Sequence, residues 1–190
     1  QKLYSSFNCF YNCKSQHGAA IFLYNAAGDI YFTSCIDCGS DKENSNGPIF
    51  FDAVRKGNIT KVSYINMTQC KSANEGGFYI DDCCQSEYDY ITLTYCSGQS
   101  MFSIRKDENI SIVMSNINII NCTLIDGSSS LFLINNFELI INFLYVFDCN
   151  LDAYGRMFKL YNSESVLVNE LVTNHDSSTV SDDPINIINS

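Results

Sequence analysis

The chain has 190 residues, a net charge of −10 and a hydrophobic content of 46%, which suffices for one sizeable core. A charged content of only 17% excludes an intrinsically disordered chain. The acidic balance disfavours nucleic acid and anionic membranes as partners, because phosphate binding needs a basic stripe. No apolar run approaches the roughly 18 residues of a membrane span, so we expect no membrane insertion by this segment.

A short apolar run that ends in a polar residue and then a cysteine recurs along the chain. The cysteines at these endings are Cys13, Cys38, Cys70, Cys96, Cys122 and Cys149, and His175 takes the next place. Successive members are 25, 32, 26, 26, 27 and 26 residues apart. A regular period in this range indicates a repeat architecture. We therefore predict that these seven residues form an inward-facing core ladder.

Three strand-like pieces recur within each repeat. The first is a β-branched run such as Ile59–Val62, and the second runs into the cysteine, as Ile65–Met67 does. The third follows a Gly- or Ser-rich break and carries an aromatic residue at one place, at Phe22, Phe50, Tyr79, Phe102, Phe132 and Phe158. We expect these rings to form an aromatic stack. No sustained helical spacing of apolar residues is present, so we predict no helix.

The length of the repeat defines the expected fold. Three short strands and three turns in one period describe one coil of a parallel β-solenoid, and the breaks rich in Gly, Asn and Asp suit its sharp corners. Equivalent residues of successive coils would stack about 4.8 Å apart. The sequence thus predicts an all-β parallel β-helix of about seven coils as a single segment over residues 1–190. Because no polar terminal cap is visible, we expect it to be part of a longer chain.

The chain resembles the right-handed parallel β-helix repeats of the pectin-lyase-like superfamily. The pieces Gly18–Ile21 and Gly76–Tyr79 are similar to its Gly-Gly-Ala-Ile turn-strand, and Phe7–Asn12 is similar to its Phe-x-x-Asn strand. Within the superfamily, the chain looks most like surface repeats of the polymorphic-membrane-protein type. Gln99–Met101 and Gly155–Met157 depart from this pattern because they lack the double glycine. The resemblance implies a right-handed coil and a surface protein.

These patterns favour a non-enzymatic structural or adhesive scaffold of a cell-surface, extracellular or filamentous assembly. Its expected partners are neighbouring domains or subunits, with glycans as further candidates. Ten cysteines and four candidate N-glycosylation sequons, at Asn58, Asn66, Asn109 and Asn121, favour an extracellular or cell-surface location. We expect Asn121 to occupy a corner and to bond along the stack. One alternative is an intracellular, cilium-type assembly component with reduced thiols.

The other alternative is a carbohydrate-binding or pectinase-like module, which needs carboxylates that converge with a basic residue. Asp81–Asp82 stands alone, His17 lies several coils away, and Arg55–Lys56 and Arg105–Lys106 have no aligned carboxylate set. An acidic loop of Asp81, Asp82, Glu87 and Asp89 fits a solvated bulge better than a calcium cage. A groove lined by Tyr79, Asp81, Asp82 and Tyr88 would favour the carbohydrate-binding alternative. We predict no catalytic residue, no metal and no cofactor.

The cysteine chemistry leaves alternatives open. Cys35-x-x-Cys38 has the spacing of two zinc ligands, and Cys9 and Cys13 lie one coil below, so a four-cysteine cluster or inter-coil disulfides are conceivable. Stacked Cα atoms about 4.8 Å apart are within disulfide range, but their parallel Cβ vectors would strain the bond. We expect mostly free buried thiols with an occasional bridge. Vicinal Cys83–Cys84 is the candidate reactive spot, and both His17 and His175 are expected to be structural.

Overall fold

The structure, a computed structural model, describes most of the chain. The described residues are 2–15, 19–24, 27–39, 49–53, 60–81, 86–105, 111–125, 129–135, 138–151, 155–161, 165–176, 179–180 and 186–189. No α-helix occurs among these residues, as the sequence predicts. None of them therefore forms a helix long and apolar enough to span a bilayer.

Three sheets of parallel strands build the molecule. The nine-stranded long sheet contains β1 (Lys2–Tyr11), β3 (Ala27–Ile36), β5 (Lys61–Thr68), β7 (Glu87–Thr94), β10 (Ser111–Ile120), β13 (Glu138–Ile141), β14 (Leu144–Phe147), β16 (Ser165–Thr173) and β17 (Asn186–Asn189). The six-stranded short sheet contains β2 (Ile21–Tyr24), β4 (Phe50–Ala53), β6 (Glu75–Asp81), β9 (Ser100–Arg105), β12 (Ser130–Asn135) and β15 (Arg156–Tyr161). The corner sheet contains β8 (Ser97–Gly98) and β11 (Thr123–Leu124).

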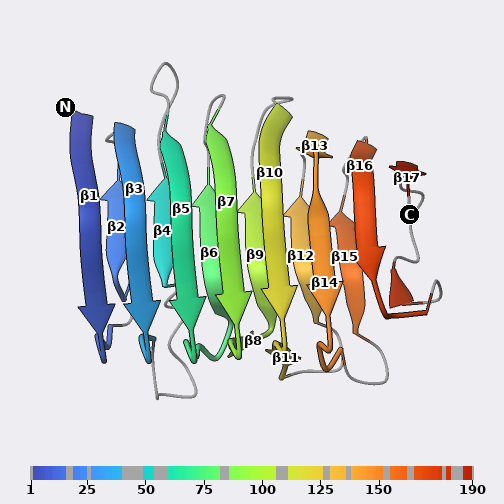
Figure 1. Cartoon of the computed structure of the whole chain (residues 1–190), viewed down its shortest axis with the longest axis horizontal. Helices are drawn as coiled ribbons and strands as arrows, with labels where there is room; N and C mark the ends of the chain where they lie inside the picture. Colours follow the sequence, from blue (N-terminus) through green and yellow to red (C-terminus); the bar gives the residue numbers. More distant parts are fainter. Residues whose placement is uncertain are drawn as a thin grey trace.

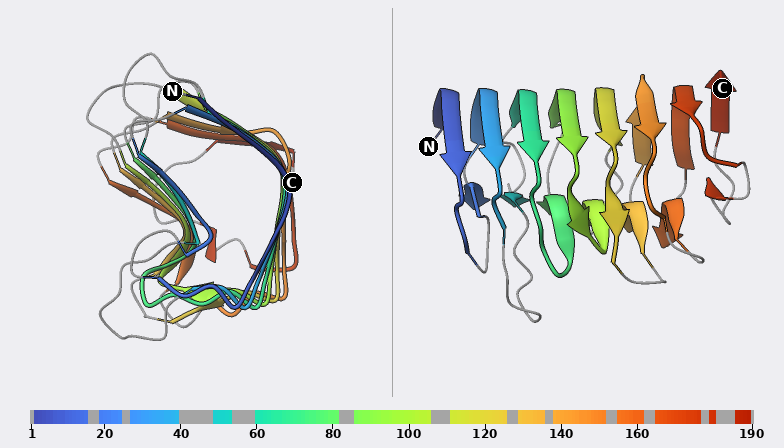
Figure 2. Two further views of the ribbon diagram at one scale, coloured as in Figure 1. Left: turned by 90° about the vertical axis from the view of Figure 1, so that its left-hand side faces the viewer. Right: turned by 60° about the horizontal axis from the view of Figure 1, so that its bottom comes forward.

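The chain visits these sheets in turn and so forms a parallel β-solenoid of about five turns. The strands of each sheet lie side by side from β1 to β17 (Figure 1). Seen along the stack, successive coils lie over one another around a common interior (Figure 2). Isolated bridges continue the corner sheet in both directions, from Lys71 to Ser97 on one side and from Thr123 to Asn150 on the other. The expected count of about seven coils is therefore corrected to about five turns.

The first and second strand pieces predicted for each coil run together as one bent strand. In β5, Val62, Ile65, Met67 and the following Cys70 are buried, while the residues between them face outward. Tyr64 has a φ of 58°, in the left-handed region. The side chains of Ser63 and Tyr64 therefore both face outward, and the inward–outward alternation of the strand resumes at Ile65. The same inward spacing recurs in β3, β7 and β10. Only β13 and β14 stay separate, so the prediction of three short strands in every coil is wrong in this respect.

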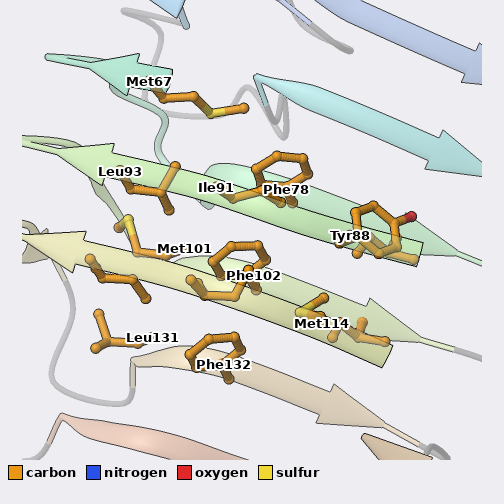
Figure 3. Packing of buried hydrophobic residues seen from close by; sticks show 14 of the residues in the cluster. Met67, Phe78, Tyr88, Ile91, Leu93, Met101, Phe102, Met114, Leu131 and Phe132 are labelled. Carbon is orange, nitrogen blue, oxygen red and sulfur yellow. The ribbon is translucent and has the colours of Figure 1, made fainter. Parts of the chain in front are cut away.

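The interior beneath the short sheet is a stack of phenylalanine rings. Phe50, Phe78, Phe102, Phe132 and Phe158 are all buried, and successive ring centroids lie 4.9, 5.1, 4.9 and 5.1 Å apart. Figure 3 shows the middle of this stack beside Met101 and Leu131. Burying each such ring contributes on the order of 1.5–3 kcal/mol. The stack is therefore a main source of cohesion between coils.

Two members of the expected aromatic stack are corrected. Phe22 and Tyr79 lie on the outer side of the short sheet, because Ile21 and Phe78 are the residues in register with Phe50. The register shifts between Glu75 and Phe78, and this shift moves the aromatic of β6 by one place. Since strand side chains alternate, a one-residue offset reverses the face on which a ring lies.

Candidate functional site

The cysteine ladder lies at the corner where the long sheet ends. Cys38, Cys70, Cys96, Cys122 and Cys149 are buried, and Cys13 in the first coil is partly exposed. Each ladder cysteine follows a residue with positive φ, namely Asn12, Asp37, Gln69, Tyr95, Asn121 or Asp148, with φ between 51° and 56°. Asn and Asp tolerate this conformation best. The chain thus turns at the residue with positive φ, and the side chain of the cysteine that follows points inward.

The buried ladder thiols all bond to backbone carbonyl oxygens. Cys70 Sγ lies 3.4 Å from the carbonyl oxygen of Cys35 in the preceding coil and 3.6 Å from that of Thr68 in its own. The other buried members, Cys38, Cys96, Cys122 and Cys149, repeat this pair of contacts at 3.5–3.6 Å. A thiol is small, mostly apolar and a weak donor. Those properties suit a corner where two carbonyl oxygens point inward.

The pKa of these cysteines varies along the ladder. All eight cysteines among the described residues are free thiols, which leaves no bridge within that set. Burial raises the pKa of the Cys35 thiol well above its ordinary value and that of Cys38 to about 11, so neither supplies a thiolate near neutral pH. Further along the ladder, hydrogen bonds between neighbouring thiols lower the pKa of Cys70 and Cys122 and raise that of Cys96 and Cys149. No group of three or more His, Cys, Asp or Glu side chains in the described ranges is placed to hold a metal. Cys83 and Cys84 lie outside those ranges.

His175 takes the next place in the ladder as an acceptor. Its Nε2 accepts a hydrogen bond from the backbone amide of Cys149 at 3.3 Å. Burial lowers the pKa of His175, with Asp148 and Asp176 opposing that shift. The acceptor role requires the neutral imidazole. Beside it, Asn174 Nδ2 donates to Asp148 Oδ1 at 2.7 Å and thereby continues the corner along the stack. His17 lies outside the described residues.

A second row of aromatic rings lies on the outer face of the long sheet. This aromatic row consists of Phe7, Phe32, Tyr64 and Tyr90, whose rings are stacked at 4.9, 4.7 and 4.8 Å with interplanar angles of 9° or less. All four residues have positive φ, between 50° and 58°. They are 80%, 47%, 44% and 46% exposed. The row is therefore a surface feature and not a part of the core.

The sequence contains a signal for this row. Each of its members stands six residues before a ladder cysteine, where Asn116 and Phe143 follow in the next two coils. A left-handed conformation costs a bulky residue about 1–2 kcal/mol, whereas each aromatic pair contributes roughly 0.5–1.5 kcal/mol. Stacking with two neighbours thus offsets the backbone cost. Asn116 tolerates the conformation without a ring and donates to Asp89 Oδ1 at 2.8 Å.

The residues of the expected carbohydrate groove do not share one surface. Tyr88 is buried, and its hydroxyl donates to the carboxylate of buried Asp52 at 2.8 Å. Tyr79 lies on the outer side of the short sheet, where the guanidinium of Arg105 is 5.4 Å from its ring centroid. Asp81 is in register with Arg105, so one carboxylate, rather than a converging set, aligns with that cation. Asp82, Arg55, Lys56 and Lys106 lie outside the described residues.

The other described carboxylates of the expected acidic loop, Glu87 and Asp89, lie in β7 of the long sheet, and each has a different partner. Glu87 forms an ion pair with Lys61 at 2.8 Å, and Asp89 accepts the hydrogen bond from Asn116. Glu75 is nearly buried beside the short sheet; burial raises its pKa, and the charge of Arg105 opposes that shift. These carboxylates engage separate partners on different sheets.

The two described sequons differ in exposure. Asn66 is exposed on the outer face of the long sheet, between the outward Tyr64 and Thr68. Asn121 has a φ of 52° and intermediate exposure, and its backbone amide donates to Phe147 O at 3.0 Å. It therefore lies at a corner, where we expected it. Asn58 and Asn109 lie outside the described ranges.

No protein-family model, no curated protein and no solved structure matches this chain. The function proposed below therefore rests on the geometry of the two sheets, the cysteine ladder and the aromatic row.

Proposed function

We propose that this chain is a non-enzymatic β-helical scaffold, structural or adhesive, in a surface, extracellular or filamentous assembly. The observation that carries the proposal is the aromatic row, because its rings lie on the outer face of a regular sheet. Contiguous exposed apolar side chains on a soluble protein mark contact surfaces. A solenoid presents such side chains at fixed spacing along its length. Neighbouring domains or subunits are the partners that this geometry suits.

We infer a right-handed coil of the pectin-lyase-like kind. Connections between parallel strands of one sheet are right-handed in about 98% of cases. The resemblance of Gly76–Tyr79 and Phe7–Asn12 to the surface-repeat pattern supports the same hand. The buried cysteine and phenylalanine ladders support the repeat character of the chain but not a closer relationship.

The location of the scaffold is proposed from two observations that point in different directions. The exposed sequon at Asn66 favours the cell surface or the outside of the cell. The free thiols, including exposed Cys9, favour the second candidate, an assembly component inside a cell. Mass spectrometry of the protein from its natural source separates them: a glycan on Asn66 supports secretion, whereas an unmodified Asn66 with every thiol reduced supports the intracellular candidate.

Two experiments test the scaffold proposal. One asks whether the chain folds without a ring of the aromatic row, and the other asks whether it degrades a polysaccharide. We expect Tyr64→Asn to leave the far-UV circular dichroism and the cooperative unfolding transition unchanged, because Asn occupies the equivalent place at residue 116. We also expect no release of products from homogalacturonan. Loss of the fold in Tyr64→Asn would assign the row to stability and remove the support for a contact surface. Turnover abolished by Asp81→Asn would show a carbohydrate-active enzyme instead.

A further inference from the structure

A regular row of aromatic rings crosses the outer face of the first four long strands, among polar side chains that include Lys61, Asn66 and Asp89. The aromatic row crosses β1, β3, β5 and β7 at their bends, and exposed Tyr4, Tyr11 and Tyr95 extend the aromatic surface on either side. Figure 1 shows these strands as neighbours at the N-terminal end of the long sheet. Aromatic residues, tyrosine and phenylalanine among them, are enriched in protein interfaces. The aromatic row, rather than the whole face, therefore has the composition of a contact surface.

The stacking of the rings restricts what this face can bind. The rings of Phe32 and Tyr64 each contact another ring on both sides at 4.7–4.9 Å, so their planar faces are covered and only their edges point outward. A sugar or a flat small molecule binds best against an open ring face. A ridge of ring edges instead fits the side chains of another regular sheet, in the manner of two sheets packed face to face.

Charge does not oppose contact at this face. Its four strands contain two lysines, Lys2 and Lys61, and three carboxylates, Asp29, Glu87 and Asp89, for a net charge of −1 against −10 for the chain. Lys2 pairs with Asp29 and Lys61 with Glu87, both at 2.8 Å. Most of the negative charge that would repel a second copy of the chain therefore lies elsewhere.

The face is large enough for a specific contact. Four strands of eight to ten residues, at about 4.8 Å spacing and about 3.3 Å rise per residue, cover roughly 600 Å². Two such faces together give roughly 1,200 Å², which exceeds the approximately 1,000 Å² expected of a biological interface. The remaining long strands can extend the contact.

We propose that two copies of this chain associate laterally, long sheet against long sheet, with their aromatic rows in the contact. An isologous pair needs a self-complementary surface, and a locally neutral ridge of ring edges meets that requirement. This inference rests on the proposed scaffold function, to which it adds a partner. A lateral pair would make a thicker rod and leave both ends of each solenoid accessible.

Sedimentation equilibrium of the chain and two matched variants tests the pairing. Tyr64→Asn removes a ring from the row, while Tyr161→Asn removes a tyrosine of similar exposure, 46% against 44%, from the outer side of the short sheet. We expect Tyr64→Asn to weaken self-association by about tenfold or more, equivalent to about 1.4 kcal/mol. Tyr161→Asn should leave it unchanged. Circular dichroism of both variants establishes that they are folded.

Measurements on the same samples also show which results would contradict the lateral pairing. Small-angle scattering should show a thicker cross-section for the pair, whereas a doubled length would show end-to-end association and overturn the proposal. A chain that remains monomeric at high concentration, or a dimer that both variants weaken equally, would also overturn it. A glycan on Asn66 would overturn it too, because Asn66 lies on the same outer face two residues from Tyr64. A monomeric elongated rod without turnover would contradict the pairing alone and leave the scaffold function standing.

Discussion

The thiol of Cys96 lies 3.5 Å from the carbonyl oxygen of Met67 in the preceding coil. Met67 stands three residues before Cys70, the ladder cysteine of that coil. Every buried ladder cysteine makes the equivalent contact. Packing and weak hydrogen bonding at a corner therefore account for the repeated cysteine.

Replacing a ladder cysteine should destabilise the fold. Cys96→Ala removes a buried sulfur and its contacts with two carbonyl oxygens, and we expect a loss of about 1–2 kcal/mol in the free energy of unfolding. Urea denaturation measures this loss. The control is Cys9→Ala, because Cys9 is exposed and should change stability by less than about 0.5 kcal/mol. Equal effects at both positions would contradict a structural role for the ladder.

Thiol reactivity should follow burial. In the native protein, iodoacetamide should modify Cys9 rapidly and Cys35 and Cys38 only after unfolding, because burial raises the pKa of both buried thiols. Peptide mass spectrometry of native and denatured samples reads out each site. Rapid native labelling of Cys35, or a disulfide among the eight described cysteines, would show that the ladder is misassigned.

The stability contribution of His175 should depend on pH. Its pKa in the folded chain is lowered from 6.5, so the folded state binds fewer protons than the unfolded state below that pH. The contribution is complete above about pH 6.5 and declines as pH falls through the folded-state pKa. NMR titration should give His175 a pKa below 6.5, and His175→Asn should reduce the acid loss of stability. A pKa above 6.5 would contradict the neutral acceptor.

Gly39 is the glycine whose replacement can be predicted most sharply. Its φ is 138°, and a Cβ atom there would overlap the backbone carbonyl oxygen of Lys71 in the next coil. Gly39→Ala should therefore cost more than about 2 kcal/mol. Gly28→Ala is the control, because its Cβ would approach only the flexible Leu23 side chain at 3.0 Å. Thermal unfolding of both variants decides the point, and equal midpoints would contradict the described corner.

The repeat was readable from the sequence because a solenoid returns each residue type to one place. The cysteine spacing located the buried corner, and Phe102, Phe132 and Phe158 located the inner side of the short sheet. Tyr79 was misplaced because the register shift after Glu75 moves the strand by one residue, and such a shift leaves no clear mark in composition. Tyr64 and Tyr90 were missed because bulky residues seldom adopt positive φ. Only their stacking makes that conformation favourable.

Ring-to-ring nuclear Overhauser effects test the stacking register of the long sheet most directly. Tyr88 and Tyr90 lie two residues apart in one strand, yet the structure places Tyr88 inside and Tyr90 outside, stacked 4.8 Å from Tyr64. In a sample with labelled aromatic residues, we predict strong contacts between the rings of Tyr64 and Tyr90, between Tyr64 and Phe32, and between Tyr88 and Phe78. A contact between Tyr64 and Tyr88, with none between Tyr64 and Tyr90, would contradict the coil register, the aromatic row and the contact surface built upon it.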